Sequence, residues 1–278
     1  MVRIVSDTST LYGTRQAAQA GFSVSPLSVT VDGHTYREFD EIGAEEFTDI
    51  IRQGHIPASS QPAVGEVLAL YEQYAQDEVL NITMADGLSG TYASAAAAAE
   101  MCENKHKVIV LNSRTLCGPH RYLVEQAAKL AAQGERLEHI VRRVRELMAT
   151  AKSYLIPADF AYLRRGGRLS ALVSYVGQAT KFAPVLTQTE GGERLTIAGV
   201  RRSFDHAVRY VGDALIKHGV GEGWRVYITH GAAPHLAEKA LAKLKEVFPT
   251  AVFQVLPLSP VFITQGGPDC VAIQAIHE

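Results

Sequence analysis

The sequence predicts an α/β protein of two domains, the first built on a parallel sheet and the second on a mixed sheet. Short apolar runs alternate with amphipathic helical segments through the first half of the chain. Repeated strand–helix units of this kind form a parallel sheet with helices on both faces. After about residue 152 a hairpin pattern appears between helices, which indicates a different topology. We therefore expect domains at residues 1–155 and 156–278.

In the first domain, strands are expected where a short apolar run precedes a polar turn, and helices where apolar residues recur every three or four positions. The expected strands are residues 2–5, 22–31, 78–83 and 107–111. The expected helices are residues 15–20, 44–52, 65–74, 92–102, 120–132 and 137–151. Pro26 places the second strand near a sheet edge, because proline cannot donate a ladder hydrogen bond.

The second domain is expected to mix hairpins and helices. Residues 184–188 and 194–199 resemble a hairpin that turns at Gly191-Gly192. The other expected strands are residues 153–157, 225–229, 252–256 and 271–276. The expected helices are residues 160–163, 172–180, 205–218 and 235–248.

Composition excludes several classes of protein. The 278 residues include 27 basic and 29 acidic side chains, so the basic excess typical of a nucleic-acid binder is missing. No apolar segment approaches the roughly 20 residues that span a bilayer, and the N-terminus lacks a signal-peptide pattern. We expect a cytoplasmic protein without stable membrane insertion. The three cysteines are too far apart for a zinc site or a disulfide framework, and we expect no metal.

A first polar loop, ITMADGLSGTYASA, connects an expected strand to an expected helix. Ligands of α/β sheets bind at such carboxyl ends of strands. Ser89, Gly90 and Thr91 open the helix, where free backbone N–H groups and the helix dipole suit a carboxylate or a phosphate. Ser89 or Thr91 acting as a simple helix cap is the alternative.

Two further polar loops occupy comparable positions. In PASSQPAVGE, Ser59 and Ser60 precede a helix, and helix capping is again the alternative. In SPVFITQGGPDC, a tight GGP turn follows an apolar strand, so that Thr264 or Gln265 can present a polar tip to a cleft. A plain turn is the alternative for this third loop.

Two other patterns leave alternatives open. GLSGT approaches the GxSxG nucleophile elbow but displaces the last glycine, so a serine hydrolase acting through Ser89 stays an alternative. The segment YLRRGGRLS holds three arginines, including Arg168, and a further pair lies at Arg201 and Arg202. Such clusters suit a phosphate or the acidic face of a partner, whereas a solvated basic loop is the alternative.

Taken together, these segments resemble the DegV family. The motifs SDTST, SSQPAVGE, GLSGTYASA, YLRRGGRL with the following KFAPVLT, and QGGP match that family in order and spacing over essentially the whole chain. The resemblance implies two α/β domains with a long-chain fatty acid, such as palmitate or oleate, bound between them and no cofactor. It also implies that the chain presents the acyl carboxylate to a separate ATP-using fatty acid kinase subunit.

The resemblance assigns roles to particular residues. The carboxylate is expected at Ser59, with Ser60 as the adjacent alternative, and at Ser89 in the loop that continues through Gly90 and Thr91. Partner-facing roles are implied for Arg168 and for Arg201 or Arg202.

Three positions depart from the family pattern. Gln265 stands where the family has histidine, and it can donate a hydrogen bond but cannot carry a positive charge. Asp269 replaces a glycine, and Asp86 replaces a small hydroxyl residue, where an inward-pointing acid would repel a carboxylate.

The sequence contains no GxxxxGK[ST] segment and no other ATP-binding signature, so we expect no catalysis by this chain alone. A phosphotransferase resembling dihydroxyacetone kinase and a lipid chaperone or sensor without a kinase partner remain alternatives.

Overall fold

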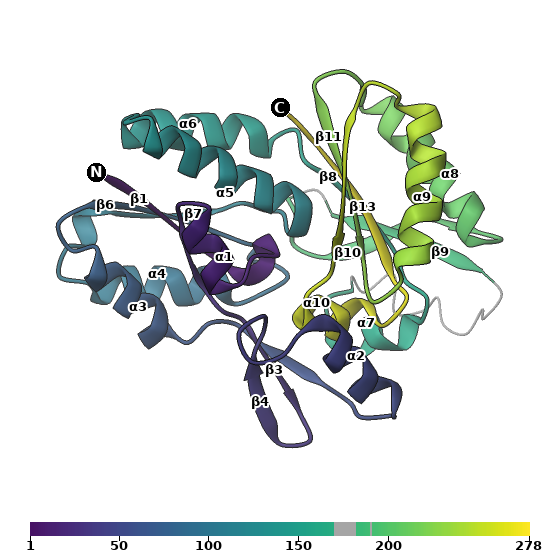
Figure 1. Ribbon diagram of the computed structural model, residues 1–278, viewed down its shortest axis with the longest axis horizontal. Helices are drawn as coiled ribbons and strands as arrows, with labels where there is room; N and C mark the ends of the chain where they lie inside the picture. The colour runs from purple at the N-terminus through teal and green to yellow at the C-terminus, as the bar shows by residue number, and fades with distance from the viewer. Residues whose placement is uncertain (170–181, 190) are drawn as a thin grey trace.

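The computed structural model describes residues 1–169, 182–189 and 191–278, and its strands form three sheets. Figure 1 shows the first sheet with its helices on the left and the second sheet with its helices on the right. A small sheet lies below the space between them. Within these residues, no helix has the length and apolar character needed to cross a membrane.

The first sheet is entirely parallel, as predicted. Its order is β2 (Ser23–Ser25), β1 (Val2–Asp7), β6 (Glu78–Thr83) and β7 (Val108–Asn112). Side chains alternate along each strand, so Ile4 and Leu80 pack on one face while Val5 and Val79 pack on the other.

Helices cover both faces of this sheet, which confirms the predicted layering. The face of Ile4 is covered by α1 (Thr14–Gln19), α5 (Cys117–Ala132) and α6 (Leu137–Met148). The face of Val5 is covered by α3 (Val64–Gln73) and the alanine-rich α4 (Thr91–Met101), which allow close packing through small side chains. Short 3₁₀ turns, η1 (Thr8–Thr10) and η2 (Lys105–Lys107), follow β1 and precede β7.

The second sheet is mixed. Its order is β10 (Leu195–Arg201), β9 (Ala183–Gln188), β8 (Lys152–Ile156), β13 (Val271–His277), β11 (Trp224–His230) and β12 (Val252–Pro257). The antiparallel pairing of β9 with β10 confirms the predicted hairpin. α8 (Phe204–Lys217) and α9 (Pro234–Val247) cover one face. The helix expected at 172–180 lies outside the described residues. The domain division after residue 155 stays a prediction, and it falls within β8.

The single strand expected at 22–31 is wrong. The chain leaves the parallel sheet after Ser25 and enters a different sheet at Ser28, with Pro26 between the two strands. Proline lacks the N–H that a central ladder needs, so the break falls beside it. The small antiparallel sheet has the order β4 (His34–Arg37), β3 (Ser28–Val31) and β5 (Ala58–Ser60). The helix α2 (Ala44–Arg52) lies between β4 and β5 along the chain.

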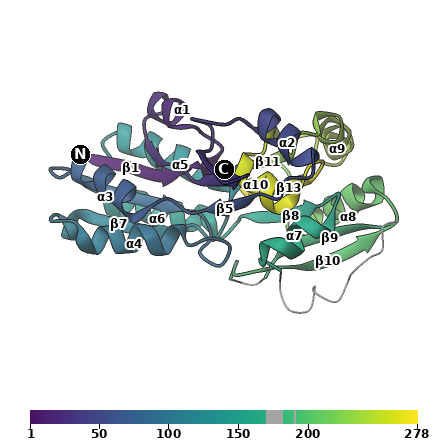
Figure 2. The same cartoon turned by 90° about the horizontal axis from the view of Figure 1, so that it is seen from below.

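The expectation of an apolar strand before the GGP turn is also wrong, because these residues form the helix α10 (Pro260–Gly266). Proline at the first helical position favours this outcome, and a short apolar run does not distinguish a buried helix from a strand. Figure 2 shows α10 near the centre of the molecule, close to β5 and β8. Its neighbour α7 (Phe160–Gly166) ends at Gly167, whose φ of 68° is the left-handed conformation that glycine favours.

Glu38 is a fully buried acid at the junction of the small sheet with α10. Its carboxylate accepts a hydrogen bond from the backbone N–H of Val261 at 3.0 Å and another from the Thr8 hydroxyl. Burial raises the pKa of Glu38 from 4.5 to about 7, although these hydrogen bonds oppose the shift. The protonation of one side chain is thus linked to the position of α10.

We predict that Glu38→Gln flattens the pH dependence of stability. The folded-state pKa lies above the unfolded value, so the contribution of Glu38 is fully present below about pH 4.5 and is lost as the pH rises through about 7. The expected loss in the wild type is on the order of 3 kcal/mol. Urea unfolding of both proteins between pH 4.5 and 8 measures it, and two parallel curves would contradict the prediction.

Candidate functional site

A largely apolar pocket lies between the small sheet, α10 and the face of the second sheet that α8 and α9 leave uncovered. The space within it is about 970 Å³, which includes solvent at its open side. Its apolar lining includes Leu88, Leu155, Leu163, Leu186, Leu195 and Phe262. The pocket is therefore suited to an apolar group.

Ser59 and Gln265 meet at the polar side of this pocket. β5 carries Ser59 and α10 carries Gln265, whose Nε2 donates to Ser59 Oγ at 2.9 Å. Gly166 makes this arrangement possible, because a Cβ there would lie 2.0 Å from Gln265 Oε1. That Oε1 atom is buried and has no hydrogen-bond partner among the described residues. The amide thus holds an unused polar atom beside the pocket.

Ser89 reaches the pocket from the loop between β6 and α4. Its Oγ lies 2.8 Å from Thr91 Oγ1 and accepts a weaker bond from the backbone N–H of Thr91 at 3.3 Å. Ser89 therefore has a capping contact and also lines the pocket. Gly90 precedes α4, and Gln61 packs against it, with a Cβ at Gly90 only 3.0 Å from the Gln61 Cδ.

The predicted carboxylate-binding residues are thus partly brought together. Four of them line the large pocket, namely Ser59, Ser60, Ser89 and Gln265. Thr91 is buried behind Ser89, and Gly90 lines a polar space next to the pocket rather than the pocket itself.

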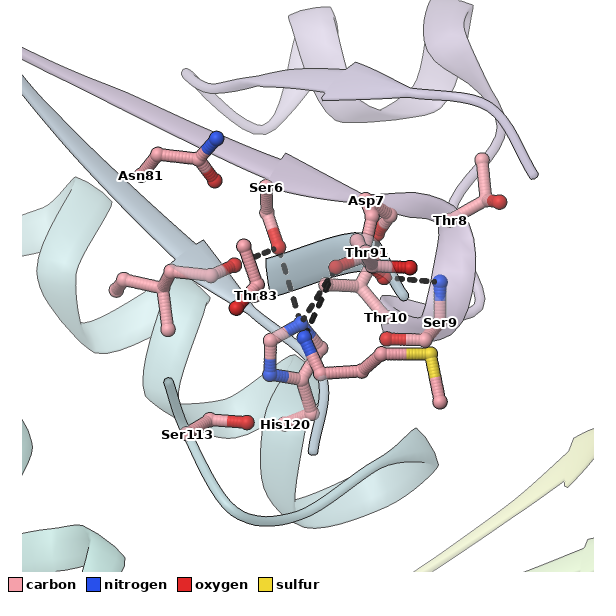
Figure 3. Close-up of polar contacts among 12 residues, drawn as sticks. Ser6, Asp7, Thr8, Ser9, Thr10, Asn81, Thr83, Thr91, Ser113 and His120 are labelled. Carbon is pink, nitrogen blue, oxygen red and sulfur yellow. Dashed lines mark hydrogen bonds and ion pairs between the residues drawn. The ribbon is translucent and has the colours of Figure 1, made fainter. Parts of the chain in front are cut away.

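Asp7 positions the loop that carries Ser89. Figure 3 shows Asp7 at the end of β1 among buried hydroxyl side chains. Its carboxylate accepts from the backbone N–H groups of Ser9 and Met84, both at 2.9 Å. Met84 is the first residue after β6, so the bond ties the start of this loop to the end of β1. An aspartate with both oxygens so engaged favours a structural role.

His120 lies beside Asp7 and is neutral. Ser6 donates its hydroxyl hydrogen to the carbonyl of Ile82 at 2.7 Å, so its oxygen accepts from His120 Nε2 at 3.0 Å. This assigns the ring hydrogen to Nε2. Burial lowers the pKa of His120, and Asp7 only partly opposes the shift. Since Nε2 donates, His120 cannot act as the base of a Ser6 nucleophile.

The arginines predicted to face a partner occupy different environments. Arg168 lines the pocket and donates from Nε to the carbonyl of Leu88 at 3.2 Å. Burial and the nearby charge of Arg194 lower the pKa of Arg168. Arg201 stacks on the ring of Tyr210, 3.8 Å from its centroid, and Arg202 is exposed. Neither Arg201 nor Arg202 lines the pocket.

The two unexpected acids do not line the pocket. Asp269 forms an ion pair with Arg52 of α2 at 3.1 Å. Asp86 is exposed and accepts a hydrogen bond from the backbone N–H of Gly87 at 2.8 Å. Asp86 does line the adjoining polar space, together with Ser89 and Arg168, so it lies near the Ser89 end of the site.

The surroundings of Ser89 do not support a hydrolase. No histidine forms a hydrogen bond with Ser89 in the described part of the chain, so the serine–histidine pair of a serine hydrolase is not formed there. The same residues contain no cluster of histidine, cysteine and acidic side chains suited to a metal ion.

Sequence reasoning missed several polar residues of the pocket, among them Ser153 and Gln274, and it missed Leu27 among the apolar ones. Both polar residues occur in strands whose inward neighbours are apolar, and this break in the alternation was the available signal.

The fold and the pocket define an α/β protein of two large sheets with a largely apolar pocket between its elements. The DegV family model matches residues 1–278, and the chain belongs to the DegV family. It is 28% identical to a DegV domain-containing protein of Listeria monocytogenes, over 98% of this chain and 97% of that protein.

Solved structures show the same fold. The structure of DegV, a fatty acid binding protein from Bacillus subtilis, superposes with a TM-score of 0.88 at 26% identity and covers 100% of this chain and 99% of that one. A DegV family protein from Thermus thermophilus, described for its fatty acid binding, gives a TM-score of 0.86 at 25% identity with the same coverage.

We predict that Gly87→Ala strains the contact between the Ser89 loop and the β9–β10 hairpin. A Cβ at Gly87 would lie 2.2 Å from the backbone of Glu193, so one of the two segments must move. Overpacking of this kind lowers the free energy of unfolding by about 1–3 kcal/mol. Denaturant unfolding measures the loss, and hydrogen exchange locates it.

Gly65→Ala is the matched control, because Gly65 lies in α3 and nothing surrounds its Cβ position within 4 Å. It should raise stability by up to about 1 kcal/mol. Equal stability of the Gly87→Ala variant and the wild type, with unchanged exchange in both segments, would contradict the prediction.

Proposed function

We propose that this protein binds a long-chain fatty acid, with its tail in the apolar pocket and its carboxylate at Ser59, Ser89 and Gln265. The observation that carries the proposal is the hydrogen bond between Gln265 and Ser59 at a largely apolar pocket that Ser89 also lines. The fatty acid binding described for the Bacillus subtilis and Thermus thermophilus relatives supports it.

The tail supplies most of the affinity. A sixteen-carbon acid buries about fourteen methylenes, and each contributes about 0.8 kcal/mol, for roughly 11 kcal/mol in all. Association itself costs roughly 4–15 kcal/mol, so the tail mainly offsets that cost. A hydrogen bond to the charged head group adds about 1.5–3 kcal/mol. The polar side chains therefore fix the orientation of the head group.

We further propose a binding role without catalysis, in which the chain presents the carboxylate to a fatty acid kinase subunit. The lack of an ATP-binding signature supports this division of labour. Arg168, Arg201 and Arg202 are the proposed partner-facing residues. Arg168 is suited to this role because it lines both the pocket and the polar space that adjoins it. Palmitate as the ligand and a cytoplasmic location stay predictions.

Native mass spectrometry of the purified protein, followed by denaturation and lipid identification, tests the proposed ligand. We expect one fatty acid per chain that is released on denaturation. A protein that carries no lipid and takes up neither palmitate nor oleate would overturn the proposal. Transfer of phosphate from ATP to the bound acid only in the presence of a kinase subunit tests the presenting role.

We predict that Ser89→Ala weakens fatty-acid binding about tenfold without abolishing it, as expected for one lost head-group hydrogen bond. Displacement of a fluorescent fatty-acid analogue measures the affinity. Ser28→Ala serves as the matched control. Ser28 lies on β3, opposite Ser60 of β5, but does not line the pocket itself. Wild-type affinity of Ser89→Ala would show that the carboxylate lies elsewhere.

A further inference from the structure

The face of the second sheet that lines the pocket carries one apolar row and one polar row. Leu155 on β8 pairs with Leu186 on β9 and with Ala272 on β13, and these three form the apolar row. Two residues further along the same strands, the same face carries the polar row Ser153, Gln188 and Gln274. All six residues line the pocket.

The amide of Gln274 has a fixed orientation. Its Oε1 accepts from the backbone N–H of Gly118 at 3.2 Å, and its Nε2 donates to the carbonyl of Leu116 at 3.0 Å. An N–H group cannot accept and a carbonyl cannot donate, so exchanging the two amide atoms would break both bonds. The second hydrogen of Nε2 therefore points to Ser153 Oγ, 2.9 Å away.

The hydroxyl hydrogen of Ser153 is left for another acceptor. Because Gln274 Nε2 donates to it, Ser153 Oγ acts as the acceptor in that bond and keeps its own hydrogen. No acceptor for this hydrogen is found among residues 1–169, 182–189 and 191–278. Ser153 is half-buried and lines the pocket, so a bound molecule can supply that acceptor.

Gln188 offers the complementary group. Its Nε2 donates to the carbonyl of Arg114 at 3.2 Å, which leaves Oε1 as a carbonyl acceptor with no protein donor in the described part of the chain. Gln188 lines the pocket at the same level of the sheet as Ser153. The polar row thus presents one free donor and one free acceptor on adjacent strands.

We propose that Ser153 and Gln188 recognise a hydroxyl group on the acyl chain, so that the pocket prefers hydroxylated long-chain fatty acids over plain ones. A hydroxyl group both accepts and donates, and it therefore matches this donor and acceptor together. In an apolar pocket, an unmatched donor beside a hydrocarbon chain is unfavourable, whereas a matched one contributes to binding. The proposal rests on the proposed fatty-acid function and specifies its substrate class.

A ligand-by-variant cycle tests this preference. Octadecanoic acid and its 2-, 3-, 10- and 12-hydroxy derivatives are compared on the wild type, Ser153→Ala and Gln188→Leu by displacement of a fluorescent fatty-acid analogue. For at least one positional isomer, the wild type should favour the hydroxy acid about three- to tenfold more than Ser153→Ala does. Gln188→Leu should reduce the same preference, which keeps the test valid if one variant folds poorly.

Ser59→Ala is the control, because it acts on the carboxylate and should weaken plain and hydroxylated acids by the same factor. The decisive quantity is the affinity for each hydroxy acid divided by the affinity for octadecanoic acid. If this ratio is the same in the wild type and in both variants for every isomer, the polar row holds only water and the proposal is overturned. If the wild type binds none of these acids, the proposed fatty-acid function itself fails, and the two outcomes are distinct.

Discussion

The pocket depends on the hydrogen bonds that join the first turn of α5 to the second sheet. Gln274 accepts from the N–H of Gly118, one of the N–H groups that the start of a helix leaves without an intrahelical partner, and donates to the carbonyl of Leu116, the residue just before the helix. The ring of Tyr227 packs directly against Gly118, and a Cβ at Gly118 would lie only 2.2 Å from that ring. Because α5 packs on the first sheet as well, this contact fixes the spacing of the two sheets and leaves the pocket beside it.

The polar side of the pocket is assembled from segments that are distant in the sequence. Asp7 holds the start of the Ser89 loop, and Glu38 holds the start of α10, which carries Gln265. Both carboxyl groups accept backbone N–H groups, and such bonds are strongest when the carboxyl group is ionised. Rigid anchors behind Ser89 and Gln265 let two neutral side chains present a defined geometry to a head group, although neither carries a charge.

The sequence was informative where periodicity is strong and uninformative where contacts are distant. The parallel sheet, its helices and the β9–β10 hairpin follow from local patterns. The family motifs pointed to Ser59 and Ser89, and both residues line the pocket, while their role in binding stays a prediction. The segment before the GGP turn was expected to be a strand but is a helix, because seven apolar residues show too little periodicity to distinguish the two. The bond between Gln265 and Ser59 joins positions 206 residues apart, and no local pattern encodes such a contact.

The hydrogen-bonding capacity of buried polar groups separates those that hold the fold from those available to a ligand. A buried donor or acceptor without a partner costs about 1–3 kcal/mol, so such atoms are tolerated mainly where another molecule can reach them. Gln274 is only 2% exposed, and its amide is engaged on both sides, which suits a residue that joins two sheets. Gln265 Oε1 and the Ser153 hydroxyl hydrogen both lack a partner among the described residues, and both side chains line the pocket. These two groups therefore lie where a ligand can satisfy them, whereas other unpaired buried atoms, such as Ser25 Oγ and the Tyr227 hydroxyl, lie away from the pocket.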